Sequence, residues 1–400
     1  MKLVRTLLAA VALAALALTI RPALADPSGE PIKIGSTLAL TGPLAATSIV
    51  HKIVGEYYID RLNHKNGLLG RPVQWILKDD QSKPELARTL YEQLLTVDKV
   101  DLLMGPYATG AILQAMGVAQ RYNKVLIHHT FGIPSLAKYD LQFPAWSLGP
   151  DPGKTFPNTL FDALAAAPHP PKTIAIIAEK FPSVLFISEG AREVAKTRGL
   201  NEVLYLEYDF GNQDFGPIAA RIKDANPDLL FMGALGLDGN LLLEAMKKID
   251  YTPHYHFYMY PAAGPMAVSP LAKGALAASI FEQHPPFTND PVAAEFCKAF
   301  NQRAAEAKLP YTLVETQAAV SFTAWQLLEA AVTATNSLDD QKIGAWLKTH
   351  KVQTIQGPLH FDGPNNYGDD LTKVKQVQDS KWVTVWPRQW APPGVTLQGY

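Results

Sequence analysis

The chain has 400 residues, of which 48% are hydrophobic and 18% charged, and its formal net charge is −1. This length is sufficient for two globular domains, and the composition is too apolar for a disordered chain. Because 36 basic residues are balanced by 37 acidic ones, there is no excess of positive charge to attract a nucleic acid. The composition therefore favours a folded protein of two domains that binds no nucleic acid.

The N-terminus has the three parts of an export signal. Two basic residues precede a largely apolar run over residues 7–20, and an Ala-x-Ala pattern ends at Ala25. The run is shorter than the ~20 residues that span a bilayer, so a retained anchor is the weaker alternative. We predict a signal peptide over residues 1–25, cleaved after Ala25, and an exported protein.

From Ile32 onward, short apolar runs alternate with amphipathic segments. The runs expected to form strands are 32–40, 73–78, 101–104, 125–127, 173–178, 203–208, 228–232 and 255–260. The segments expected to form helices are 49–63, 86–95, 112–121, 184–198, 218–225, 241–249, 293–307 and 316–335. This alternation is typical of βαβ units, whose parallel sheets are covered by helices on both faces.

Two local patterns mark helix ends. Ser82-x-x-Glu85, with Pro84 between them, predicts a capping box in front of the second helix. Gly199 is expected to lie just past the end of the helix over residues 184–198.

Proline-rich breaks at residues 143–153 and 284–286 interrupt the alternation, and we interpret them as crossovers between two α/β lobes. We place the N-terminal lobe at residues 26–148 and 283–355, and the C-terminal lobe at residues 149–282 and 356–400. In open parallel sheets a ligand binds outside the carboxyl ends of the strands. The cleft between the lobes is therefore the expected site.

Motifs of catalytic chemistry are missing from the sequence. The loop over residues 105–110 has the outer glycines of a phosphate loop, but Ala111-Ile112 stands where Lys-Ser/Thr is required. The single cysteine, Cys297, excludes a disulfide framework, and neither a Gly-x-Ser-x-Gly nor a His-Glu-x-x-His motif is present. The adjacent His128 and His129 would point to opposite faces of a strand, which favours one hydrogen-bonding histidine in the cleft over a metal site. The sequence predicts neither a cofactor nor an enzymatic activity.

Several short segments follow one another in a characteristic order. They are Leu40-Thr41-Gly42-Pro43-Leu44-Ala45, Asn66-Gly67-Leu68-Leu69-Gly70-Arg71-Pro72, Lys78-Asp79-Asp80-Gln81, Gly105-Pro106 and Gly357-Pro358-Leu359 with Phe361-Asp362. Together they resemble the periplasmic solute-binding proteins of the branched-chain amino acid type, which feed ABC importers. The resemblance implies a type I periplasmic binding protein, with two Rossmann-like lobes of parallel-rich sheets joined by a hinge of several crossovers. It also implies a monomer that closes on a small ligand and delivers it to an ABC permease in the inner membrane.

The resemblance carries a carboxylate site onto two loops of the first lobe. By position these loops provide Ala108, Thr109, Thr130, Phe131 and Gly132. Backbone N–H groups and the two threonine hydroxyls can donate to an oxyanion, and Thr109 lies just before a helix N-terminus. The alternative is that both threonines only cap or pack.

The departures from the family pattern concern the ligand. Amino-acid binders of the family commonly carry an acidic residue for the ligand ammonium, but the corresponding stretch over residues 254–261 contains no carboxylate. Because a buried ammonium without a counter-charge is costly, we expect an organic acid, most plausibly an aromatic or apolar carboxylate. A hydrophobic amino acid is the alternative ligand and would need Asp238 or Glu179, and a sensor protein that presents its ligand to a membrane receptor is the alternative role. The further candidate ligand contacts are Thr47, Ser48, Tyr107, His128, His129, Phe181, Ser183, Leu235, Tyr258 and Tyr260.

Overall fold

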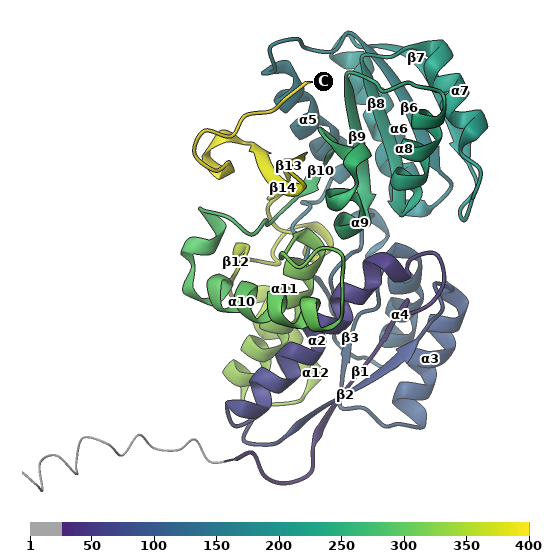
Figure 1. The fold of residues 1–400 in the computed structure, drawn as a ribbon. Coiled ribbons are helices and arrows are strands. Elements are labelled where there is room, and N and C mark those ends of the chain that lie inside the picture. The colour runs from purple at the N-terminus through teal and green to yellow at the C-terminus, as the bar shows by residue number, and fades with distance from the viewer. Residues whose placement is uncertain (1–25, 400) are drawn as a thin grey trace, which may run out of the picture.

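The computed structural model describes residues 26–399, which form two α/β lobes, one above the other in Figure 1. The predicted signal peptide lies outside the described residues. Each lobe has a parallel-rich sheet with helices on both faces, so the predicted fold class is confirmed. We call the lobe that contains β1 the first lobe and the other one the second lobe.

The first lobe is built on a five-stranded parallel sheet in the order β2-β1-β3-β4-β5. Its strands are β1 (Ile32–Leu38), β2 (Val73–Asp79), β3 (Leu102–Met104), β4 (Leu126–His128) and β5 (Gln142–Pro144). Helices α3 (Pro84–Thr96) and α4 (Thr109–Arg121) pack together on one face. The other face is covered by α2 (Ala45–His64) with α11 (Thr316–Thr335), flanked by α10 (Pro291–Glu306) and α12 (Asp340–Thr349). Since β3 and β4 are buried along their whole length, they read as continuous apolar runs.

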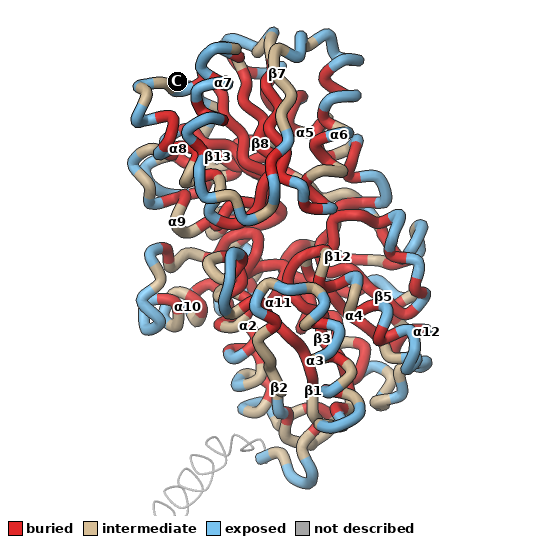
Figure 2. The backbone as a smooth tube through the Cα atoms, turned by 90° about the vertical axis from the view of Figure 1, so that its right-hand side faces the viewer, coloured by how far each residue is buried: buried red, intermediate tan, exposed pale blue. Residues whose placement is uncertain are grey.

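The second lobe is built on a seven-stranded sheet in the order β14-β13-β10-β9-β8-β6-β7. Its parallel strands are β6 (Thr173–Glu179), β7 (Asn201–Tyr208), β8 (Leu229–Gly236), β9 (Tyr255–Pro261) and β10 (Leu276–Ser279), and β13 (Lys373–Gln378) and β14 (Lys381–Trp386) add an antiparallel edge. One face packs on α5 (Pro152–Ala165) and α6 (Pro182–Thr197). The other packs on α7 (Gly216–Ala225), α8 (Asp238–Lys248) and the short α9 (Ala263–Val268). Buried backbone follows the central strands of both lobes and continues through the region where they meet (Figure 2).

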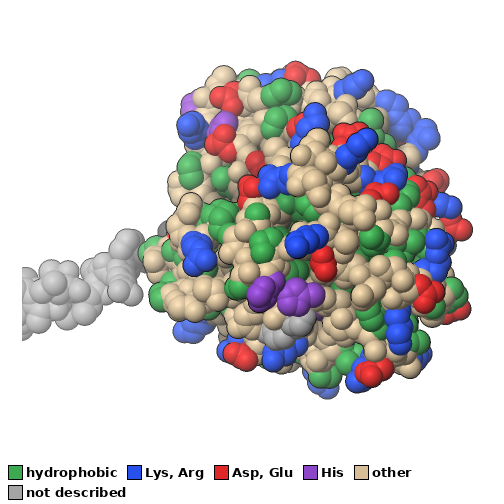
Figure 3. All heavy atoms as spheres, turned by 90° about the horizontal axis from the view of Figure 1, so that it is seen from above, with side chains coloured by type: hydrophobic (Ala, Val, Ile, Leu, Met, Phe, Trp, Pro, Cys, Tyr) green, Lys and Arg blue, Asp and Glu red, His purple; other side chains and the backbone are tan. Residues whose placement is uncertain are grey.

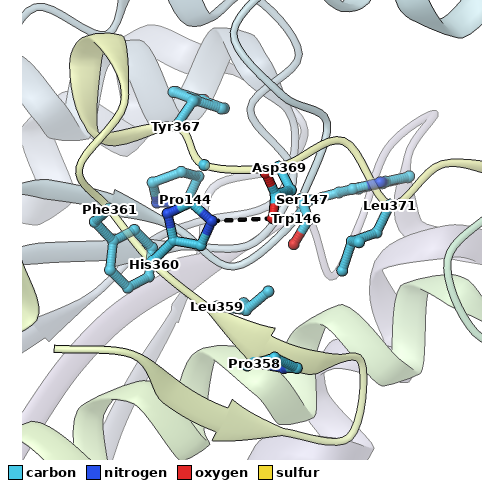
Figure 4. A pocket seen from close by; sticks show the side chains of 11 residues that line it. Pro144, Trp146, Ser147, Pro358, Leu359, His360, Phe361, Tyr367, Asp369 and Leu371 are labelled. Carbon is cyan, nitrogen blue, oxygen red and sulfur yellow. Dashed lines mark hydrogen bonds and ion pairs between the residues drawn. The ribbon is translucent and has the colours of Figure 1, made fainter.

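Chain segments distant in sequence are joined at the crossover between the lobes. Leu148 pairs with Asp370 in an isolated antiparallel bridge, and the Leu371 N–H donates to the Ser147 carbonyl at 2.9 Å. The buried Lys375 ammonium lies 2.8 Å from Glu282 and 3.7 Å from Glu315, so it ties the second sheet to the start of α11. Figure 4 shows the neighbouring turn, in which His360 bonds to Asp369.

The hairpin of β11 (Val352–Thr354) and β12 (Gly357–Leu359) precedes this crossover. Phe361 and Tyr367, which follow β12, belong to the core of the first lobe, and Phe361 packs edge-on against Phe143 at 5.3 Å. The boundary predicted at residue 356 therefore lies within a packed segment of the first lobe. We propose residues 368–372 as the crossover instead.

Each strand and helix expected from the sequence is present, with ends shifted by a few residues. Gly199 has a φ of +77° directly after Arg198, as a helix-ending residue should. The capping box at Ser82 is wrong, because Lys83 is the residue that precedes α3 and the Ser82 hydroxyl instead donates to the Thr41 carbonyl at 2.8 Å. The helices α5, α9 and α12 and the strands β5, β10 and β11 are additional elements that the sequence did not predict. Strands β12, β13 and β14 lie in the tail from residue 357, where the sequence indicates short strands and turns.

Charged side chains of both signs are interspersed over the face of the molecule in Figure 3. No helix between residues 26 and 399 is long and apolar enough to cross a membrane.

Candidate ligand site between the two lobes

A small cavity lies where the two lobes meet. Its wall is drawn from the first lobe, the crossover and the second lobe, namely Tyr107, Ala108, Thr109, Thr130 and Gln317, then Trp146 and Leu148, then Ser183, Leu235 and Tyr260. The side chains of the wall carry no acidic and no basic group. Because both lobes contribute to the wall, neither lobe forms the site alone.

Helix α4 presents its N-terminus to this cavity. Ala108 precedes the helix with φ +71° and ψ 147°, a conformation that residues with a side chain rarely adopt, and no side chain caps the helix. The Ile112 N–H makes the first helical bond, to the Ala108 carbonyl, so the N–H groups of Thr109, Gly110 and Ala111 have no acceptor within the helix. These groups and the positive end of the helix dipole favour an anion.

A second helix N-terminus meets the first from the other lobe. Helix α6 follows Phe181 without a side-chain cap, and Ser183 in its first turn lines the cavity. A Cβ added to Gly132 would lie 2.8 Å from the Ser183 Cβ, closer than two side-chain carbons approach. The absence of a side chain at Gly132 therefore allows the lobes to touch beside Thr109.

Two threonine hydroxyls are oriented by backbone bonds. Thr109 Oγ1 accepts the Gly132 N–H at 3.0 Å, and Thr130 Oγ1 accepts the Ala108 N–H at 2.9 Å. Each hydroxyl keeps its own hydrogen, and the contact from Thr109 Oγ1 to the Thr130 carbonyl is long at 3.5 Å. Both hydroxyls are thus able to donate to an oxyanion in the cavity.

The rest of the cavity wall is apolar and aromatic. Trp146 and Tyr260 pack edge-to-face with ring centroids 5.2 Å apart, beside Leu148 and Leu235. Neither Trp146 Nε1 nor the Tyr260 hydroxyl has a hydrogen-bond partner among residues 26–399, although buried groups of this kind usually have one. Flat apolar surfaces with polar tips suit an aromatic or apolar ligand.

A polar cluster continues the first-lobe wall behind Tyr107. His51 of α2 stacks on His129 with a centroid distance of 4.2 Å and lies 5.0 Å from the Tyr107 ring. Burial lowers the pKa of His51 to about 3, outweighing a polar contact with Gln317 that acts in the opposite direction. Burial also holds the pKa of His129 well below its usual value. Both rings are therefore neutral at physiological pH.

Two carboxyl groups of the second lobe lie behind Leu235. Glu179 accepts the Leu235 N–H at 3.1 Å, and Asp238 accepts the Tyr208 hydroxyl hydrogen at 2.8 Å. Burial, followed by the charge of Asp238, raises the pKa of Glu179, and burial also raises that of Asp238. Neither side chain lines the cavity.

The predicted site residues fall into two groups. Those that line the cavity are Tyr107, Ala108, Thr109, Thr130, Ser183, Leu235 and Tyr260. Those that do not line it, although all are buried, are Thr47, Ser48, His128, His129, Phe131, Gly132, Phe181 and Tyr258. Thr47 lines a neighbouring apolar cavity, His128 bonds to Gln142 at 2.6 Å, Phe131 meets the His128 ring edge-on, and Phe181 packs on Phe210.

Tyr258 needs a correction. Side chains alternate along β9, so Tyr258 points to the opposite face of the sheet, where it packs beside Gly239 of α8. The register between β8 and β9 shifts between Met232 and Leu235, and Tyr260 packs with the cluster on the cavity side. If side chains alternated through the whole strand, Tyr258 and Tyr260 would lie on the same face of the sheet. The register shift that accompanies their separation has no signal in the sequence.

Three wall residues were missed by the sequence reasoning. Trp146 and Leu148 lie in the proline-rich break that was interpreted as a crossover, which was a usable signal. Gln317 lies in the first turn of α11, where the Glu315 carboxylate accepts its N–H at 2.9 Å, and no sequence pattern marks it. Over the part of the chain that the structure describes, no group of three His, Cys, Asp or Glu side chains is arranged to hold a metal ion.

Residues 31–381 match the family described as periplasmic binding protein. A Leu/Ile/Val-binding protein homologue of Brucella abortus is 24% identical over 94% of this chain and 98% of its own length. The Leu/Ile/Val-binding protein of Escherichia coli is 22% identical over 83% of this chain and 87% of its own. The chain belongs to the periplasmic binding protein family, in its branched-chain amino acid type, whose members are solute-binding receptors and not enzymes.

Solved structures show the same fold. The leucine-binding protein LivK of Thermotoga maritima aligns with a TM-score of 0.75 and 18% identity, covering 88% of this chain and 97% of its own. A solute-binding protein of an ABC transporter from R. palustris, solved in complex with benzoate, aligns with a TM-score of 0.77 and 17% identity, covering 89% and 95%. At these identities the likeness is one of fold.

Proposed function

We propose that this protein is the receptor of an ABC importer for a small organic acid, an aromatic or otherwise apolar carboxylate. The observation that carries the proposal is the meeting of two uncapped helix N-termini, α4 and α6, at a cavity whose wall has no charged side chain. A carboxylate placed there would accept hydrogen bonds from backbone N–H groups and from the hydroxyls of Thr109 and Thr130. Its charge is balanced by helix dipoles, so no arginine or lysine is required.

The apolar part of the wall supports the second half of the proposal. Trp146, Leu148, Leu235 and Tyr260 offer ring faces and aliphatic surface to the body of the ligand. The solute-binding protein from R. palustris, which has a similar fold, was solved with benzoate, a ligand of this kind. Ligand binding would stabilise the closed arrangement of the two lobes about the hinge, because each lobe supplies part of the cavity wall.

In the proposed transport cycle, the signal peptide is removed and the protein acts in the periplasm as a monomer. It closes on one ligand and presents the closed form to its permease in the inner membrane. No chemical step is involved, so affinity and the difference between open and closed lobes are its whole mechanism.

A hydrophobic amino acid is the second candidate ligand, favoured by the buried Glu179 behind Leu235. This carboxyl group accepts the N–H of Leu235, which lines the cavity, and the curated relatives include Leu/Ile/Val-binding proteins. An amino acid would require Glu179 to give up the Leu235 N–H and turn to the ligand ammonium.

A thermal-shift experiment separates the two candidates. The purified protein is unfolded and refolded to remove bound ligand, then heated with benzoate, 4-hydroxybenzoate, phenylacetate, leucine or valine. A ligand at 100 times its Kd adds ~2.7 kcal/mol, enough for a shift of a few degrees. We expect aromatic acids to raise the Tm and the amino acids to leave it unchanged. The variant Thr130→Val, which keeps the shape but loses one donor, should need about ten times more acid for the same shift. A shift with leucine or valine alone would overturn the carboxylate proposal.

A further inference from the structure

Four buried side chains of the first lobe carry polar atoms without partners beside the cavity. We call them the histidine wall: Ser48, His51, His129 and Gln317, whose exposed fractions are 0%, 1%, 3% and 4%. The atoms concerned are Ser48 Oγ, both ring nitrogens of His51, His129 Nδ1 and Gln317 Oε1. None of them has a hydrogen bond of ordinary geometry within residues 26–399, although the His51 and Gln317 side chains lie close to one another. Native proteins seldom leave several neighbouring buried groups unpaired, because each such group has lost its bonds to water.

The histidine wall is continuous with the ligand cavity. Gln317 and Tyr107 both line the cavity, and the His51 ring lies 5.0 Å from that of Tyr107 and makes a polar contact with Gln317. His129 stacks on His51 and directly precedes Thr130, which also lines the cavity. Ser48 and His51 are three residues apart on α2, so they share one face of that helix. The unpaired atoms therefore gather on one side of the site.

The chemistry of this wall selects an uncharged partner. The two rings are neutral, so a second carboxylate would find no cation there, and an ammonium would find no anion among the four side chains. Gln317 Oε1 only accepts hydrogen bonds, whereas the Ser48 hydroxyl and a neutral imidazole both donate and accept. A hydroxyl group, which also donates and accepts, satisfies such a set.

We propose that the solute carries a hydroxyl group in addition to its carboxylate, and that His51, Gln317 and Ser48 receive this hydroxyl. The ligand class is then a hydroxylated aromatic acid, and His51 is a specificity-determining residue. This inference rests on the proposed function, since it places the second polar group of the same ligand.

Calorimetric titration with matched ligand pairs tests the inference. The pairs are benzoate with 3- and 4-hydroxybenzoate, and phenylacetate with 4-hydroxyphenylacetate, so that each pair differs by one hydroxyl. In the unaltered protein we expect at least one hydroxylated acid to bind ~10-fold or more tightly than its parent, because a site built for a hydroxyl discriminates against its absence. In His51→Phe this ratio should fall to about 3-fold or less, while the parent acid keeps its affinity within about 3-fold.

Two further variants protect the test against a folding defect. Gln317→Leu should lower the same ratio, because it removes the acceptor at the cavity wall. Thr323→Val is the matched control: its hydroxyl in α11 is also buried and has no partner between residues 26 and 399, but it does not line the cavity, so the ratio should be unchanged. Each variant is first checked for a cooperative thermal transition.

The outcomes distinguish the two proposals. If both members of each pair bind equally well, the hydroxyl inference is overturned and the carboxylate proposal stands. If terephthalate or 4-(aminomethyl)benzoate binds more tightly than every hydroxylated acid, the wall serves a charged group and the inference is again overturned. If no acid binds at all, both proposals fall.

Discussion

The two lobes share one order of parallel strands but carry different residues at equivalent positions. The parallel strands have the order β2-β1-β3-β4-β5 in the first lobe and β7-β6-β8-β9-β10 in the second, so α4 and α8 follow equivalent strands. The N-terminus of α4 has no acidic residue in its first turn, whereas α8 begins with Asp238, beside the buried Glu179. One helix end is free of carboxyls, whereas the other carries Asp238 in its first turn. The fold supplies both positions, and the residues placed there decide which of them binds.

The helices α2 and α6 differ in the same way. Each follows the first strand of its lobe, but α2 carries Ser48 and His51 toward the site, whereas α6 contributes the single polar contact Ser183. The second lobe adds Leu235 and Tyr260. The first lobe is therefore the polar half of the site and the second lobe the apolar half. Three predictions test this division.

The largest effect is expected from making α4 resemble α8. Thr109→Asp places a carboxylate at the open helix end, where it competes with the carboxylate of the ligand in a buried setting. We expect the Kd for an aromatic acid, measured by calorimetry, to rise ~100-fold or more. Thr109→Asn, of equal size and without charge, is the control and should remain within about 10-fold of the unaltered protein. Equal affinity of the Asp and Asn variants would contradict an anion site at α4.

An intermediate effect is expected from the apolar half. Tyr260→Leu removes the ring that packs on Trp146, and the Kd should rise ~10-fold, which corresponds to about 1.4 kcal/mol. Tyr260→Phe keeps the ring and removes a hydroxyl that has no partner in the described part of the chain, so its Kd for an acid without a hydroxyl should change by about 3-fold at most. If the Phe variant lost as much affinity as the Leu variant, the hydroxyl and not the ring face would be the contact.

The sequence predicted wall residues in both halves of the site. Thr109 and Thr130 were named because the family resemblance carries a carboxylate site onto the loops after β3 and β4, and both residues line the cavity. Tyr258 was placed wrongly because the register shift between β8 and β9 depends on pairing and not on local composition. His51 and Gln317 lie on helices whose contacts arise only when distant segments pack together. The order of strands and helices in each lobe can be predicted from local periodicity, but the contacts between the lobes cannot.

The smallest effect concerns the carboxyl pair at α8. Since burial raises the pKa of Glu179 and of Asp238, the folded state holds more protons than the unfolded state once the pH exceeds the ordinary carboxyl value of about 4. The contribution of this carboxyl pair to the free energy of unfolding is therefore present at low pH and is lost as the pH rises through the raised pKa values. Glu179→Gln keeps an acceptor for the Leu235 N–H and cannot ionise, so we expect the fall in Tm between pH 6 and pH 9 to be smaller than in the unaltered protein by a few degrees.

The matched control for this pair is Glu193→Gln, which removes an exposed carboxylate from α6 and should leave the slope of Tm against pH unchanged. The comparison is between slopes, because other buried carboxyls such as Glu282 and Glu315 also have raised pKa values and contribute equally to all three proteins. If Glu179→Gln and Glu193→Gln gave the same slope, the Glu179 carboxyl would not be protonated in the folded protein over this pH range. The N-termini of α4 and α8 would then differ in shape and not in charge. The absence of an acidic residue would no longer explain why a ligand anion binds at α4 and not at α8.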